Sequence, residues 1–193
     1  DTQSFFDQTD LLLEQGVYVV LIDAGVLGQA QTEADITREQ VAEAAGADLA
    51  DLVAAADRGQ AIAVMSRGAA EMVRRLHAEG RLDAVLGLGG SGGSSLISAA
   101  MRDLPIGVPK LLVSTVAAGD TRPYVGTVDL TMMHSVVDIA GINPISERIL
   151  TNAAAAAAGM AKANAVFQPT ASTRTMIGAT MFGVTTPAVT TAR

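Results

Sequence analysis

The chain of 193 residues contains no cysteine, and only 3% of its residues are aromatic. The first absence excludes disulfides, thiolate zinc sites and a cysteine nucleophile. The second leaves few side chains on which nucleic-acid bases can stack. Charged residues are scarce at 17%, and 13 Lys and Arg are outnumbered by 20 Asp and Glu. The resulting net charge of −7 repels phosphate backbones, so general nucleic-acid binding is not expected.

Long hydrophobic runs are also missing. The longest apolar stretch, residues 153–161, is far too short to span a bilayer, and no basic-then-apolar secretory segment opens the chain. Hydrophobic residues nevertheless make up 49% of the chain, which is enough for a real core. We therefore expect a folded cytoplasmic protein that contacts neither nucleic acid nor membrane. Because the chain opens on Asp1 rather than Met, we also expect a fragment.

Short β-rich runs alternate with helical patterns along the chain. Apolar runs without polar alternation are typical of strands buried on both faces of a parallel sheet. Such runs occupy residues 17–22, 84–88, 111–115 and 176–180, with a weaker candidate at 127–133 that Asp129 interrupts. Helices are marked by their ends. They are predicted after the capping-box pair Thr37 and Gln40, from Gln60 to Glu79 before Gly80, and from Asn143-Pro144 to Ala163.

This alternation predicts an α/β protein with a three-layer, Rossmann-like, doubly wound and mostly parallel sheet. A polar, proline-containing stretch at residues 167–173 has no apolar period, so we place a boundary there. Residues 1–168 are expected to form one Rossmann-like subdomain. Residues 169–193 are expected to form a linker and the start of a second α/β subdomain, which the chain does not complete.

The most informative residues are the string Gly87-Leu-Gly-Gly-Ser-Gly-Gly-Ser-Ser95, between a predicted strand and a predicted helix that begins at Leu96. In an open α/β sheet, ligands bind at this carboxyl end of a strand. Glycines let a ligand approach the backbone closely, and the unpaired amides at a helix N-terminus attract anions. We therefore predict a phosphate site formed by Gly89, Gly90, Ser91, Gly92, Gly93, Ser94 and Ser95.

Three motif templates overlap in this string, and each is incomplete. The dinucleotide pattern that starts at Gly87 lacks an acidic ribose ligand at the end of the next strand, and the phosphate-loop pattern has Gly93 where a lysine belongs. The nucleophile-elbow pattern around Ser91 is followed by Asp120 and His134 in hydrolase order. Nucleotide binding is our preferred interpretation. A serine hydrolase, an NAD-type oxidoreductase and a turn whose glycines only permit close helix–strand packing remain open.

A second polar cluster follows the next predicted strand and is expected at the same edge of the sheet. Asp120 can hold Mg²⁺ there, and Arg122 can bind a phosphate; the alternative is an ordinary turn with a surface ion pair. A third strand-end loop, later in the chain, also carries hydroxyl groups. The further nucleotide-binding candidates are therefore Thr115, Thr121, Arg122, Thr185 and Thr186, with Asp120 as the metal ligand.

Four strings of the chain, taken in order, resemble the Tm-one-like ATP-binding family. They occupy residues 87–95, 110–122, 138–143 and 178–187. The resemblance implies two Rossmann-like subdomains with ATP and Mg²⁺ as ligands, and it points toward an oligomer. It also implies a first strand before a Gly-Thr-x-Asp-Thr string, of which only Asp1-Thr2 remains here, and a second subdomain cut off after Arg193.

The glycine string thus predicts a nucleotide-binding domain, and the resemblance implies that the nucleotide is Mg-ATP; no catalytic residue is assigned. Sparse charge and apolar helix faces at residues 65–72 and 153–158 favour self-association, and closed two-fold dimers are the commonest arrangement. We therefore expect a homodimer.

Overall fold

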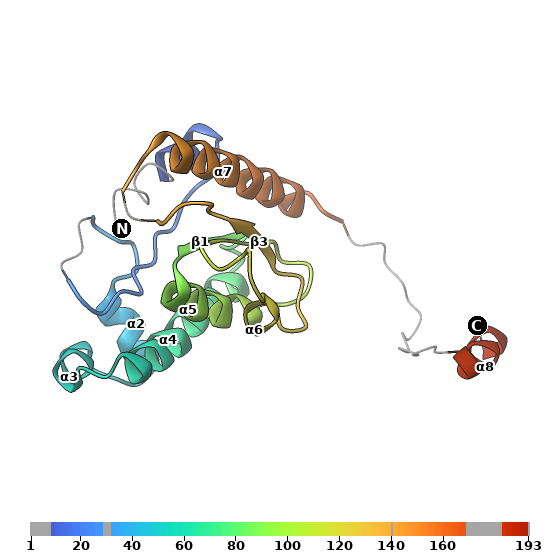
Figure 1. Cartoon of the computed structure of the whole chain (residues 1–193), viewed down its shortest axis with the longest axis horizontal. Helices are drawn as coiled ribbons and strands as arrows, with labels where there is room; N and C mark the ends of the chain where they lie inside the picture. The colour runs from blue at the N-terminus through green and yellow to red at the C-terminus, as the bar shows by residue number, and fades with distance from the viewer. Residues whose placement is uncertain (1–8, 29–31, 140, 169–182, 193) are drawn as a thin grey trace.

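The computed structural model describes residues 9–28, 32–139, 141–168 and 183–192. At its centre is a three-stranded parallel sheet in the order β1-β2-β3 (Figure 1). The strands are β1 (Val85–Gly89), β2 (Lys110–Ser114) and β3 (Thr131–His134). In the register, Gly89 lies opposite Ser114, and Ser114 lies opposite His134. The carboxyl ends of all three strands therefore meet at one edge of the sheet.

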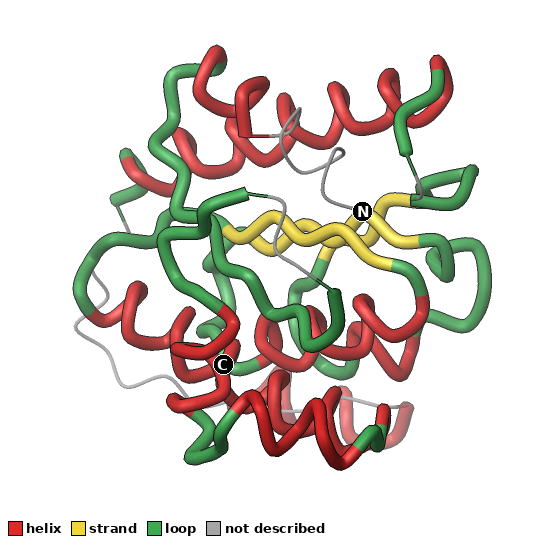
Figure 2. Tube along the Cα trace, turned by 90° about the vertical axis from the view of Figure 1, so that its left-hand side faces the viewer, coloured by secondary structure: helices red, strands yellow, loops and turns green. Residues whose placement is uncertain are grey.

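Helices cover both faces of the sheet and make three layers (Figure 2). On one face α5 (Ser91–Arg102) packs against the sheet, and α4 (Arg58–Ala78) packs against both α5 and α2 (Arg38–Ala44). On the other face lies α7 (Pro144–Ala165) (Figure 1). The other elements include α3 (Leu49–Ala55), α6 (Arg122–Val125), η1 (Gly183–Thr185) and α8 (Thr186–Ala192), and residues 9–14 are also helical. The predicted α/β, Rossmann-like architecture is confirmed.

The helix ends follow the capping signals in the sequence. Thr37 and Gln40 form a reciprocal capping box at α2, in which the Thr37 amide donates to the Gln40 side chain at 2.8 Å. The Asn143 side chain accepts from the Ile145 amide at 2.9 Å, and Pro144 occupies the first position of α7. Predicted and observed bounds of α4 and α7 agree closely, because caps act locally.

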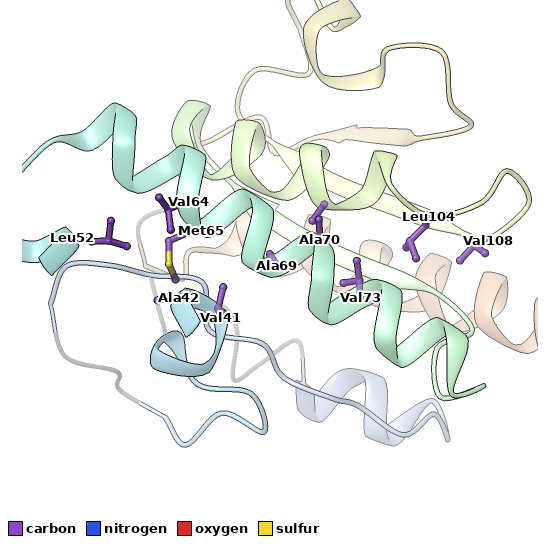
Figure 3. Packing of buried hydrophobic residues seen from close by; sticks show 11 residues of the cluster. Val41, Ala42, Leu52, Val64, Met65, Ala69, Ala70, Val73, Leu104 and Val108 are labelled. Carbon is purple, nitrogen blue, oxygen red and sulfur yellow. The ribbon is translucent and has the colours of Figure 1, made fainter. Parts of the chain in front are cut away.

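The core has two main parts, one on each side of the sheet. The first lies along α4, where Met65 is fully buried against Val41 and Ala42 of α2 (Figure 3). The second lies under α7, where Ala153 and Ala157 pack against the sheet. Alanines on this face let the helix backbone approach the sheet closely, which explains the alanine-rich stretch. No helix in the described part of the chain is long and apolar enough to cross a membrane.

Two strand predictions need correction. Of residues 17–22, only Ile22 forms a β-bridge, with Ile36, and residues 17–21 are in no strand. The physical reason is that residues 17–22 line a cavity, and no strand among the described residues lies beside them for pairing. The weak candidate at 127–133 is observed as Thr131–His134, because Asp129 instead binds Lys110. The predicted strand at 176–180 lies outside the described residues.

Candidate functional site

The glycine string is a strand end and a helix start rather than a loop. Residues 87–89 belong to β1, α5 begins at Ser91, and only Gly90 connects the two elements. The prediction that the helix begins at Leu96 is therefore wrong. Glycine and serine are poor helix formers in isolation, so the residue types in the first turn of α5 do not predict a helix. Packing on the sheet stabilises this turn instead.

Two glycines of the string serve packing. A Cβ atom on Gly87 would lie 2.4 Å from Cγ2 of Ile97, and one on Gly89 would lie 2.8 Å from the backbone of Gly93. Both distances are shorter than van der Waals contact, so any side chain at these positions would push α5 away from β1. The interpretation in which glycines permit close helix–strand packing is thus correct for this half of the string.

The other half of the string offers backbone donors. Among the described residues, the amides of Ser91, Gly92 and Gly93 form no hydrogen bond, as expected for the first turn of a helix. The Ser94 amide already donates to the carbonyl oxygen of Gly90 at 2.7 Å. Fewer amides are therefore available to bind an anion than the predicted set, residues 89–95. The helix dipole adds partial positive charge at this end of α5.

A buried hydroxyl network fixes this turn against the sheet. The Ser94 hydroxyl donates to the carbonyl oxygen of Gly89 at 3.1 Å, and its oxygen lies 2.6 Å from that of Ser114 at the end of β2. The Ser114 oxygen also accepts from the Val116 amide at 3.1 Å. The predicted ligand Thr115 lies beside the string, because a Cβ on Gly90 would be 3.8 Å from its hydroxyl oxygen.

A cation that the sequence analysis missed lies at the same turn. A Cβ on Gly92 would be 2.9 Å from Nη2 of Arg58, the first residue of α4. Arg58 is exposed and has no ion pair in the parts of the chain that the structure describes. One sequence signal was available: a cation in the first turn of a helix opposes the helix dipole, so an arginine there suggests a partner anion.

Asp120 and Arg122 pair with each other. Nε and Nη2 of Arg122 donate to the Asp120 carboxylate at 2.8 and 2.7 Å. This bond lowers the pKa of Asp120, and the same contact raises that of Arg122. The Arg122 side chain is 89% exposed. No group of three or more His, Cys, Asp or Glu side chains suited to a metal ion occurs among the described residues.

The remaining candidates lie at different places. The His134 ring nitrogen Nδ1 is 3.4 Å from the carbonyl oxygen of Ser114, and no hydrogen bond joins it to Ser91 or Asp120 in the described part of the chain. Thr121 precedes α6 without capping it through its side chain. Thr185 ends η1 and Thr186 begins α8, which lies apart from the sheet (Figure 1). The structure therefore does not bring these two threonines to the glycine string.

Comparison with known proteins identifies the family of the chain. A family model described as "Uncharacterised protein family (UPF0261) N-terminal domain" matches residues 3–166. The chain belongs to this family. A "UPF0261 protein" of Clostridium tetani is 47% identical to the present chain over 184 residues, which cover 95% of the present chain and 45% of the Clostridium tetani protein. A homologue from Rhizobium meliloti is 47% identical over 171 residues, covering 89% of the chain and 41% of the homologue.

Plant relatives match a shorter part of the UPF0261 chain. The tomato proteins named "ToMV susceptible protein tm-1(GCR26)" and "ToMV resistance protein Tm-1(GCR237)" are each 48% identical over 139 residues, which cover 68% of the chain and 18% of each tomato protein. The family resemblance predicted from the four strings is thereby confirmed. The chain spans less than half the length of each of these relatives.

Proposed function

We propose that this UPF0261 domain binds a nucleotide, Mg-ATP, with its phosphates at the N-terminus of α5. The observation that carries the proposal is the meeting of three amides with a guanidinium, none of which has a hydrogen-bond or ion-pair partner among the described residues. The amides of Ser91, Gly92 and Gly93 begin α5, and Arg58 lies directly beside Gly92. Helix amides and arginine are the groups that proteins use for phosphate. The site also lies at the carboxyl edge of the sheet, where ligands of this fold class bind.

The side chains around this turn suit phosphate better than the competing ligands. Ser91 has an ordinary helical backbone, whereas a hydrolase nucleophile is held on a strained turn. The end of β2 carries Ser114 and Thr115 where an NAD site needs a carboxylate. The hydroxyl of Thr115 beside Gly90 and the guanidinium of Arg58 beside Gly92 are both suited to donate to a phosphate oxygen.

The residues present fit Mg²⁺ only together with a nucleotide. Mg²⁺ commonly binds through one or two carboxylates, several waters and the phosphates of its substrate. Asp120 is the single carboxylate assigned to it here, and Arg122 now occupies that carboxylate. We propose that a phosphate would take over Arg122 and release Asp120 toward the cation. The proposal covers binding alone and assigns no catalytic residue.

Calorimetry with ATP tests the proposal. Arg58→Ala should weaken ATP binding about tenfold or more, because a charge-assisted hydrogen bond contributes roughly 1.5–3 kcal/mol. Arg67→Ala is the matched control, since Arg67 is an exposed residue of the same helix that does not border the glycine turn. Unchanged affinity in Arg58→Ala, or no ATP binding by the parent chain, would refute the site.

Two further variants separate the phosphate from the metal. Gly92→Val should abolish ATP binding without unfolding the domain, because its side chain would fill the space beside Arg58. Asp120→Ala should weaken binding in Mg²⁺ and leave it unchanged in EDTA. Equal losses in both solutions would mean that Asp120 acts on the loop structure instead. Labelling of Ser91 by a fluorophosphonate would favour the hydrolase, and binding of NADH without ATP would favour the oxidoreductase.

A further inference from the structure

The turn that follows β3 contains a strained valine. Among the described residues, two other than glycine have a positive φ, Ala56 at 50° and Val136 at 64°. Ala56 is the C-cap of α3, where a left-handed residue is common. Val136 belongs to no helix, and its branched side chain makes this backbone conformation unfavourable. Helix capping therefore does not explain the strain at Val136.

Hydrogen bonds of the two flanking residues hold Val136 in this conformation. The Val137 amide donates to the Ser135 carbonyl oxygen at 2.7 Å, which makes a γ-turn centred on Val136. With a positive φ at its centre, this is the rare and strained form of the turn. The buried Ser135 fixes it: its hydroxyl donates to the Val137 carbonyl oxygen at 2.7 Å, and its amide donates to the Ser114 carbonyl oxygen at 3.1 Å.

The valine side chain does not serve the packing of the core. Val136 is 62% exposed, whereas Ile139 in the same connection packs into the core with Leu150 of α7. Glycine adopts a positive φ without strain, so it would suit this turn better than valine. A residue that is both strained and exposed adds no stability to the fold, and such residues are concentrated at ligand sites. The strain at Val136 therefore points to a ligand contact.

Val136 lies at the same edge of the sheet as the glycine string. Its neighbour Ser135 bonds to Ser114 at the end of β2, and Ser114 lies opposite Gly89 at the end of β1. Two strand spacings, about 10 Å, separate the end of β1 from the end of β3. A nucleotide whose phosphates bind at the N-terminus of α5 can span this separation with its ribose and base.

We propose that Val136 contacts the face of the nucleotide's base and holds the base at the end of β3. This inference rests on the proposed function, which supplies the position of the phosphates. Every nucleobase presents a flat face to its surroundings, and an exposed apolar side chain is stabilised when such a face removes it from water. The γ-turn fixes Val136 before the ligand arrives, which reduces the ordering that binding requires.

Two ligands that share a phosphate chain and differ in the base test this contact. Calorimetry compares ATP with inorganic tripolyphosphate, both in Mg²⁺. Val136→Gly should weaken ATP binding about fivefold to tenfold, because the apolar contact is lost, and should leave tripolyphosphate binding unchanged. Val136→Ile keeps the contact and should bind ATP as the parent chain does. Val166→Gly, at an exposed valine at the far end of α7, is the matched control and should change neither affinity.

Urea unfolding distinguishes a ligand contact from a structural role. Val136→Gly should not lower the urea midpoint, because relief of the strain offsets the added freedom of glycine in the unfolded chain. A lowered midpoint, unchanged ATP affinity in Val136→Gly, or equal losses of ATP and tripolyphosphate affinity would each overturn the contact and leave the phosphate site in place. A parent chain that binds no tripolyphosphate would refute the phosphate site, and this inference with it.

Discussion

The hydroxyl oxygens of Ser94 and Ser114 lie 2.6 Å apart, and both residues are fully buried. Ser94 has one hydroxyl proton, which it donates to the Gly89 carbonyl, so Ser114 is the donor between the two. Every polar atom of the pair is thus satisfied, since Ser114 also accepts from the Val116 amide. The pair links the first turn of α5 to the end of β2 and fixes the turn that carries the proposed phosphate site.

Removing one hydroxyl of this pair should destabilise the domain. Ser94→Ala leaves the buried Ser114 hydroxyl without its acceptor and the Gly89 carbonyl with only the longer bond from the Thr115 amide at 3.4 Å. We therefore expect the free energy of unfolding to fall by about 1–3 kcal/mol. The control is Ser95→Ala, an exposed residue of the same turn, which should change it by less than about 0.5 kcal/mol. Urea unfolding measures both values. The double variant with Ser114→Ala should lose less than the sum of the single variants, because the two share one network; strict additivity would contradict the coupling.

The architecture could be predicted because its signals are local. Two kinds of signal act within a few residues and can be recognised in the sequence alone. They are the apolar runs that form β1 and β2, and the helix caps at Thr37 and Asn143. The start of α5 is different. Its first turn is made of residues that disfavour helices, and packing on the sheet overrides that preference. Residues 17–22 show the reverse case, in which strong strand propensity does not form a strand without a neighbour.

The close packing of α4 against α2 provides a second test of the structure. A Cβ on Gly68 of α4 would lie 1.9 Å from the carbonyl oxygen of Val41 in α2. Because that atom belongs to the backbone, α2 must move, and Gly68→Ala should lower the free energy of unfolding by about 2–3 kcal/mol. Gly159→Ala in α7 is the matched control, since its Cβ meets nothing within 4 Å. It should raise stability by about 0.5–1 kcal/mol through helix propensity. A loss of the same size in both would contradict this packing.

The candidate site could be predicted only in part, because one of its components depends on packing between distant segments. Its backbone donors belong to one contiguous string, which can be recognised in the sequence. Its cation, Arg58, comes from the start of another helix and meets Gly92 only because α4 packs on α5. The alternation of strands and helices predicts that strand ends meet at one edge, but it does not predict which helix start lies next to them. Asp120 and Arg122 are close in sequence, so their pairing was foreseeable as the surface ion-pair alternative.

A buried ammonium group lies at the other end of β2. The Lys110 side chain is 0% exposed, and its Nζ donates to the carbonyl oxygens of Pro105 and Val108 at 2.8 and 2.7 Å and to the Asp129 carboxylate at 2.8 Å. All three protons are used. The other carboxylate oxygen of Asp129 accepts from the Gly107 amide at 2.7 Å. The bond from Lys110 holds the pKa of Asp129 below its ordinary value.

This contact predicts how stability depends on pH. Because the folded state lowers the pKa of Asp129, its contribution is present above the unfolded value, about pH 4, and is lost as the pH falls through the lower folded value. Asp129→Asn removes the charge and keeps one acceptor oxygen where the carboxylate has two, so Lys110 loses its acceptor when Gly107 keeps its own. At pH 7 this substitution should cost about 1–2 kcal/mol, a reduced figure because the Asp129 side chain is 39% exposed and water screens the pair. Urea unfolding from pH 7 to pH 2.5 should show the free energies of unfolding of the parent and of Asp129→Asn converging in acid.

The control is Asp103→Asn. Asp103 lies 3.7 Å from Arg74 in an exposed ion pair, so this variant should differ little from the parent at either pH. A gap between Asp129→Asn and the parent that stays constant down to pH 2.5 would mean that the carboxylate charge does not stabilise the fold.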